Sequence, residues 1–127
     1  MNELATVEIE DVRGVPVAHI AGEVDASNAA NVQRQMIAAV ANAGAGLVVD
    51  LTRTGYVDSA GIRILFDTGE RMQIRGMQMR LVITGGSFLA DVLETVRIKE
   101  RFPVHEELGP AVAGIIDAQL HSAPASE

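Results

Sequence analysis

The run GLVVDLT at positions 46–52 constrains the fold of this chain more than any other segment. It is almost continuously apolar, which is typical of a central β-strand covered on both faces or flanked by neighbouring strands. The segments around it alternate between strand-like and helix-like patterns, with no internal repeat. This order indicates an α/β domain built on one sheet.

Three further segments predict strands beside this run. The segment 6–12 alternates apolar residues with acids, and Arg13-Gly14 predicts a hairpin turn into a second strand at 15–22. The segment 79–84 predicts a later strand, and 102–105 is weakly strand-like. Because the first two strands form a hairpin and the others alternate with helices, we expect a mixed sheet.

Four helices are predicted to pack against this sheet. The first covers 29–43 with one apolar face, capped by Ser27 or Asn28. The second begins within 55–66 and ends at Gly76, a short third follows 85–87, and the last begins at 109–110. We expect one domain over residues 1–121 and a flexible tail at 122–127.

Composition excludes several classes of protein. The 127 residues contain no cysteine and no apolar run of eighteen or more, and the N-terminus lacks an apolar signal core. We therefore expect a cytoplasmic protein without a membrane partner. The net charge of −7 repels a phosphate backbone, so nucleic acid is not the expected partner. A basic protein surface is a better electrostatic match.

The stretch GYVDSAGIRILF, at 55–66, offers three roles for Ser59: helix cap, nucleophile or phosphate acceptor. A nucleophile elbow needs G-x-S-x-G, and Val57 stands where its first glycine belongs. The sequence also places no histidine well for a triad, so we expect no enzyme. Ser59 or Asp58 is predicted to cap the second helix. Capping does not exclude phosphorylation, because a hydroxyl at a helix start is exposed.

No metal or cofactor site is predicted. Asp50 and Asp58 lie near strand ends, but two carboxylates without a histidine or a ligand spacing do not define a site. The segment Gly85-Gly86-Ser87 resembles a phosphate cradle in outline, yet it lacks the Walker lysine and the G-x-G-x-x-G pattern.

Two segments, in this order, resemble one family of bacterial regulators. GEVDASNAANVQRQM is similar to the G-E-L-D loop and first helix of anti-sigma factor antagonists, and VVDLTRTGYVDSAGIRILF is similar to their strand, D-S-[ST]-G motif and following helix. VRIKERFPVHEELGPAV resembles the last strand and helix of the family. The resemblance spans about residues 6 to 121 and implies a single STAS-like domain.

The resemblance also implies a switch and its residues. The phosphorylated serine of the family falls on Ser59, and the partner-binding positions fall on Asp25, Asp58, Ala60, Gly61 and Arg63. The implied partner is an anti-sigma factor with ATP-dependent serine kinase activity, which releases the antagonist on phosphorylation. A serine phosphatase resets the switch. Ala60 departs from the family pattern, because many members have Ser or Thr there.

Two alternatives stay open. STAS domains also serve as subunits of lipid or sulphate transporters and as parts of stress-signalling scaffolds, in which Ser59 would be only a helix cap. A small-ligand or nucleotide-binding role is a third class. The intact phosphoacceptor and the lack of a fused domain favour the antagonist.

Overall fold

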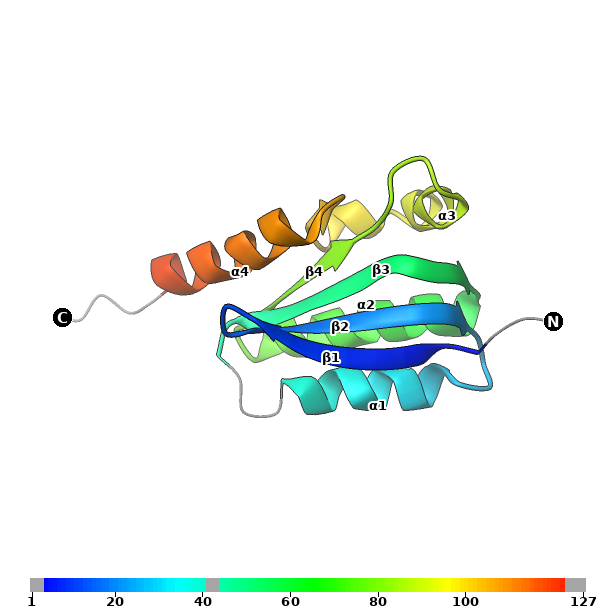
Figure 1. The fold of residues 1–127 in the computed structure, drawn as a ribbon, viewed down its shortest axis with the longest axis horizontal. Coiled ribbons are helices and arrows are strands. Elements are labelled where there is room, and N and C mark those ends of the chain that lie inside the picture. Colours follow the sequence, from blue (N-terminus) through cyan, green and yellow to red (C-terminus); the bar gives the residue numbers. More distant parts are fainter. Residues whose placement is uncertain (1–3, 41–43, 123–127) are drawn as a thin grey trace.

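The computed structural model describes residues 4–40 and 44–122 of the chain. They form a five-stranded mixed sheet in the order β1-β2-β3-β4-β5, with four α-helices (Figure 1). The strands are β1 (Thr6–Val12), β2 (Val15–Val24), β3 (Gly46–Val57), β4 (Gln78–Val82) and β5 (Val104–His105). The helices are α1 (Ala29–Ala39), α2 (Ser59–Ile74), α3 (Phe88–Thr95) and α4 (Leu108–Ser122), with a 3-10 turn η1 (Ile98–Glu100). The predicted α/β class is confirmed.

The sheet opens with the predicted antiparallel hairpin, and its other strand pairs are parallel. Arg13 and Gly14 both have positive φ, at 55° and 84°, as a tight hairpin turn requires. The Asp11 carboxylate accepts a hydrogen bond from the Gly14 amide at 2.9 Å. The strand β3 extends to Val57, beyond the predicted end at 52. This extension carries the chain directly into the start of α2.

Helices cover both faces of the sheet, which explains the apolar run of β3. In Figure 1, α1 and α2 lie on one side of the sheet and α4 lies on the other. Alternate residues of β3 enter two separate cores: Leu47 and Val49 face α1 and α2, whereas Val48 packs with Ala111, Val112 and Ile115 of α4. All three of these β3 residues are fully buried.

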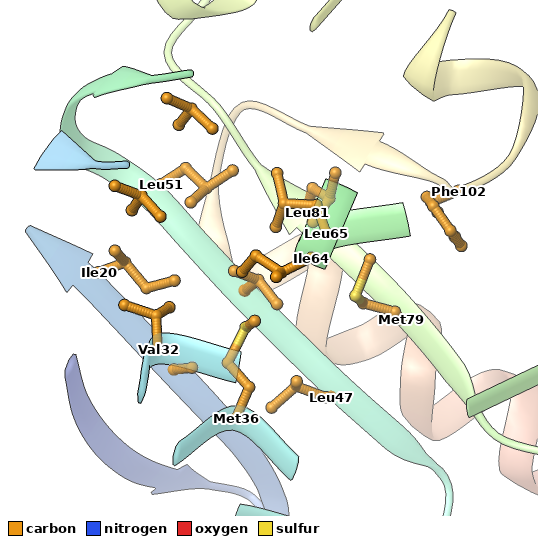
Figure 2. Close-up of a cluster of buried hydrophobic side chains, with 14 of the residues drawn as sticks. Ile20, Val32, Met36, Leu47, Leu51, Ile64, Leu65, Met79, Leu81 and Phe102 are labelled. Carbon is orange, nitrogen blue, oxygen red and sulfur yellow. The ribbon is translucent and has the colours of Figure 1, made fainter. Parts of the chain in front are cut away.

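The larger core joins the sheet to α1, α2 and α3. Figure 2 shows Ile20 and Leu47 from the sheet beside Met36 of α1, with Leu65 of α2 and Phe102 farther along the same core. Each of these side chains is at most 2% exposed. Burying a side chain of this size contributes about 1.5–3 kcal/mol to the hydrophobic stabilisation of the fold. This core fixes where α2 starts relative to the strand ends.

Some boundaries differ from the predictions. The helix α1 ends at Ala39 rather than at 43, and positions 41–43 lie outside the described residues. The predicted tail begins at 122, but α4 includes Ser122, and 123–127 lie outside the described residues. Within 4–40 and 44–122, no helix has both the length and the apolar content needed to cross a membrane.

Candidate functional site

Strand register brings Asp25 and Asp58 to one edge of the sheet. Val24 and Val57 are paired residues at the ends of the parallel strands β2 and β3. The amide of Asp58 donates a hydrogen bond to the carbonyl of Val24 at 3.1 Å, so the pairing continues one residue past the strands. The next residues, Asp25 and Asp58, therefore leave the sheet side by side. The resemblance assigned both aspartates to partner binding, and the strand register is the physical cause of their proximity.

Asp58, and not Ser59, is the N-cap of α2. Its Oδ1 accepts hydrogen bonds from the amides of Ala60 at 2.8 Å and Gly61 at 3.1 Å. Its backbone is extended, with φ −89° and ψ −170°, as an N-cap requires. Of the two caps that the sequence predicted, the structure selects the aspartate.

Ser59 is therefore the first residue of the helix, and its side chain is not used for capping. It is exposed, and within residues 4–40 and 44–122 its hydroxyl makes no hydrogen bond. A free hydroxyl at a helix N-terminus is open to an approaching enzyme and lies in a region where the helix dipole favours negative charge. The Ser59 hydroxyl is therefore accessible at a position where the helix dipole favours negative charge.

The Asp25 carboxylate is held by its own loop. Its Oδ1 accepts hydrogen bonds from the Ser27 hydroxyl at 2.5 Å and from the Ser27 amide at 2.9 Å. These bonds, with a smaller contribution from the Asn28 amide, hold the pKa of Asp25 below its ordinary value of 3.8. Asp25 is therefore charged at neutral pH, in a fixed orientation next to the start of α2.

Ser27 and Asn28 act differently from their predicted role as caps of α1. Asn28 occupies the N-cap position, but its side chain makes no cap hydrogen bond. Instead, its Oδ1 accepts from the Asp25 amide and its Nδ2 donates to the Glu23 carbonyl, both at 2.9 Å. The predicted side-chain cap is wrong because these polar groups close the loop around Asp25. An Asp followed by Ser and Asn is a local signal for such a turn.

The remaining predicted partner residues differ in accessibility. Arg63 is exposed, and Ala60 is partly buried against the main core. Gly61 is buried, and a Cβ atom there would lie 2.4 Å from Cγ1 of Val57 and 3.0 Å from Cγ1 of Val24. Gly61 therefore lets α2 approach the strand ends closely, and only Arg63 of these three presents a long side chain to a partner.

Comparison with known proteins agrees with this geometry. A family model described as the STAS domain matches residues 6–111. The chain belongs to the STAS domain family. The STAS chain is 29% identical, over 87% of its length and 88% of the relative, to a protein of Mycobacterium tuberculosis named anti-sigma-F factor antagonist RsfB.

Solved structures confirm the STAS fold. A crystal structure of an anti-sigma factor antagonist from Mycobacterium paratuberculosis aligns with a TM-score of 0.80 and 26% identity, covering 89% of this chain and 95% of that one. A structure described as a putative anti-sigma factor antagonist from Thermotoga maritima aligns with a TM-score of 0.74 at 14% identity, covering 87% and 94%. The second likeness concerns the fold alone.

Asp50 and Asp58, the two acids near the strand ends, have different roles in this STAS domain. Asp50 and Asp58 have separate partners, because Asp50 contacts Nδ1 of His19 at 2.7 Å whereas Asp58 caps α2. Across residues 4–40 and 44–122, no three His, Cys, Asp or Glu side chains are grouped to hold a metal ion.

The Gly85-Gly86-Ser87 loop does not suit a phosphate. Ser87 caps α3, since its Oγ accepts from the Ala90 amide at 3.1 Å. A Cβ at Gly85 would lie 2.8 Å from the carboxylate atoms of Glu106, so this acid lies against the loop. A second anion there would be repelled, which argues against nucleotide binding at this end of the STAS domain.

Proposed function

We propose that this STAS domain is an anti-sigma factor antagonist controlled by phosphorylation of Ser59. The observation that carries the proposal is the division of roles at the start of α2: Asp58 caps the helix, and the exposed Ser59 hydroxyl has no hydrogen bond among the residues that the structure describes. The 29% identical relative named as an anti-sigma-F factor antagonist supports the same assignment.

A phosphate on Ser59 would change the surface rather than the fold. The N-terminus of α2 favours added negative charge, while the carboxylates of Asp25 and Asp58 oppose it. Because these effects oppose each other and the Ser59 hydroxyl has no hydrogen bond to lose within 4–40 and 44–122, the cost to folding is small. The added charge, of about −1.5 to −2, then acts on whatever protein docks there.

The release step follows from desolvation. A partner that covers Asp25, Asp58 and Arg63 must remove water from this edge of the sheet. Removing water from a phosphate without a matching arginine or lysine costs several kcal/mol, which is enough to reverse binding. The partner is an anti-sigma factor that carries an ATP-dependent serine kinase activity, and a serine phosphatase restores the binding form. The chain itself is a binding switch without catalysis, and its cytoplasmic location stays a prediction.

The transporter or scaffold alternative predicts a different behaviour for Ser59. In that case Ser59 would be only a cap, but Asp58 already makes the cap hydrogen bonds to Ala60 and Gly61. Both roles use the same fold, so measurements of binding and of phosphorylation distinguish them.

The test compares Ser59→Asp with Ser59→Asn, two variants of nearly equal size that differ in charge. Binding to candidate anti-sigma factors from the same host is measured by calorimetry. We expect Ser59→Asp to bind at least about 100-fold more weakly than Ser59→Asn, because a loss of about 3 kcal/mol corresponds to that factor. Mass spectrometry after incubation with ATP should find phosphate on wild-type Ser59 and none in Ser59→Ala. Equal affinities of the Asp and Asn variants would refute the switch.

A further inference from the structure

Two of the four aromatic residues of this chain lie exposed and stacked on one another. The chain has one tyrosine, three phenylalanines and no tryptophan. Phe66 and Phe102 pack together with ring centroids 5.8 Å apart, and Phe102 is only 1% exposed. Tyr56 and Phe88 stack at 6.4 Å with an interplanar angle of 18°, yet they are 41% and 64% exposed. We refer to these two side chains as the Tyr56–Phe88 pair.

The Tyr56–Phe88 pair adjoins the phosphorylation site. Tyr56 is in β3, three residues before Ser59, which limits their separation along the chain to about 11 Å. Phe88 is the first residue of α3, and Figure 1 shows α3 at the end of the molecule where β2 and β3 finish. The pair and Ser59 therefore belong to one edge of the domain.

A local irregularity of the sheet sets the position of Tyr56. The pairing of β2 with β3 shifts between Gly22, which pairs with Thr54, and Glu23, which pairs with Tyr56. One extra β3 residue is thus inserted directly before the tyrosine. Such bulges re-aim side chains and are frequent beside functional sites. The shift accompanies the change from the buried Thr54 to the exposed Tyr56.

The core does not need the exposed rings. The residues of α3 that pack into the core are Leu89 and Leu93, which are 4% and 0% exposed. Phe88 precedes them and leaves most of its surface in water. Exposed aromatic side chains are enriched among the residues that dominate binding energy, because they bury a large rigid surface when a partner docks.

The charges around the Tyr56–Phe88 pair define the chemistry of the partner. Glu23 is the strand partner of Tyr56, and Asp25 and Asp58 follow at the same edge. These three acids outnumber the exposed Arg63, one turn into α2. The whole chain carries a net charge of −7. Arginine and lysine side chains bind to the faces of aromatic rings and also pair with carboxylates. Aromatic rings bordered by carboxylates are therefore complementary to an apolar surface that carries arginine or lysine.

We infer that the Tyr56–Phe88 pair is the apolar anchor on which the anti-sigma factor docks, with a basic and apolar surface of that partner covering both rings. This inference rests on the proposed function and adds where the binding energy comes from. In the unphosphorylated state, burial of the two rings contributes to the binding free energy. A phosphate on the nearby Ser59 would have to lose its water in the same contact, which would weaken binding. Docking would then cover the rings and the switch together.

The first test measures affinity for the anti-sigma factor by calorimetry in the variants Tyr56→Ala and Phe88→Ala. We expect each to bind at least tenfold more weakly than wild type. The matched control is Ile74→Ala, because Ile74 is 85% exposed but is the last residue of α2, at the opposite end of that helix from Ser59. This control should bind as wild type does. Circular dichroism and thermal unfolding verify that each variant is folded.

The second test uses the intact surface, so it does not depend on a variant. Because Tyr56 is the only tyrosine, the chain produced with 3-fluorotyrosine gives one ¹⁹F resonance from this surface. Unlabelled anti-sigma factor should shift or broaden that resonance in the wild type. The same addition to Ser59→Asp should leave the resonance unchanged.

The outcomes separate this inference from the proposed function. If wild type binds and Ser59→Asp does not, but the ring variants bind normally and the ¹⁹F resonance stays unchanged, the anchor is refuted and the switch stands. If wild type binds no anti-sigma factor of its host, the proposed function fails and the inferred surface fails with it. Weakened ring variants together with a shifted resonance support both.

Discussion

At the residue scale, Asp58 and Ser59 are adjacent in the chain but occupy different positions of the helix start. The Asp58 carboxylate satisfies the amides of Ala60 and Gly61, which otherwise lack partners in the first turn. Ser59 has an exposed side chain that the helix does not use. Because the cap is provided by the neighbouring residue, a group can be attached to Ser59 without removing the bonds that start α2.

Gly61 gives a stability prediction at the same scale. A methyl group there would lie 2.4 Å from Cγ1 of Val57, so Gly61→Ala must push α2 away from the strand ends. We expect the free energy of unfolding to fall by about 1–3 kcal/mol, as for other overpacked cores, measured by urea denaturation. The control is Gly55→Ala in β3, where the Cβ would meet the Gly22 carbonyl oxygen at 4.0 Å, an ordinary contact distance. Gly55→Ala should be neutral or slightly stabilising, and equal stability of the two variants would contradict the close packing at Gly61.

At the scale of the elements, one histidine joins three strands. His19 of β2 contacts Asp50 of β3 through Nδ1 and Glu10 of β1 through Nε2, both at 2.7 Å. Its side chain is 15% exposed. Burial alone lowers the pKa of His19, but the hydrogen bonds and charges of Glu10 and Asp50 outweigh burial and raise the pKa above its ordinary value of 6.5. Through these two contacts the His19 ring ties the hairpin to the centre of the sheet.

This cluster predicts a pH dependence of stability above pH 6.5. The folded state holds the His19 proton more tightly than the unfolded state, so the stabilisation is complete below pH 6.5 and is lost as pH rises through the folded pKa. For one proton the slope cannot exceed about 1.4 kcal/mol per pH unit. His19→Gln should remove this slope in chemical denaturation measured across neutral to alkaline pH.

His105 provides a control of opposite sign. Burial and the nearby guanidinium of Arg80, with Nη1 3.2 Å from Nε2 of His105, lower the pKa of His105 below 6.5. Its contribution is therefore present above pH 6.5 and is lost as pH falls through the folded pKa. His105→Gln should change the pH profile only below pH 6.5. If both variants change the same pH range, the contacts of His19 do not set its pKa.

At the scale of the whole molecule, charge and exposed apolar surface coincide at the carboxyl edge of the sheet. Asp25 and Asp58 follow the paired ends of β2 and β3, and the exposed Tyr56, which stacks on the exposed Phe88, lies two residues before Asp58. A net charge of −7 gives the domain a long-range field that attracts a basic partner and is screened by salt. At the edge near Ser59, the negative charge would therefore attract a basic partner, and the exposed rings would add binding energy once it docks.

This distribution predicts salt-dependent association. The association rate constant with the anti-sigma factor, measured by stopped flow, should fall about tenfold or more between low and high ionic strength, while dissociation changes less. Asp25→Asn should reduce this dependence more than Asp117→Asn. Both variants remove one carboxylate, but the exposed Asp117 belongs to α4, whose C-terminal part lies at the end of the molecule opposite the ends of β2 and β3 (Figure 1). Equal effects of the two variants would show that only net charge matters.

Much of the fold was predictable because burial leaves a local pattern. The alternation in 6–12 and the apolar run in 46–52 indicated β1 and β3, and the turn at Arg13-Gly14 indicated the hairpin. Boundaries were less predictable: β3 continues to Val57 because pairing with β2 extends to Val24, although Arg53 and Tyr56 are exposed. Exposed residues within a paired strand need not be apolar, so the apolar run at 46–52 ends several residues before the strand ends at Val57.

The site shows the same division between local and non-local causes. The sequence by itself determined the fold class, the order of the elements and the position of Ser59 at a helix start, since these depend on periodicity, turn residues and caps. Only the tertiary structure decided that Asp25 and Asp58 leave the sheet side by side, that His19 joins Glu10 and Asp50, and that Tyr56 stacks on Phe88, 32 positions later in the chain. Those contacts depend on strand register, on the bulge before Tyr56 and on how α3 packs against the sheet. The interactions that determine these features join residues far apart in the chain, so no local sequence pattern predicts them.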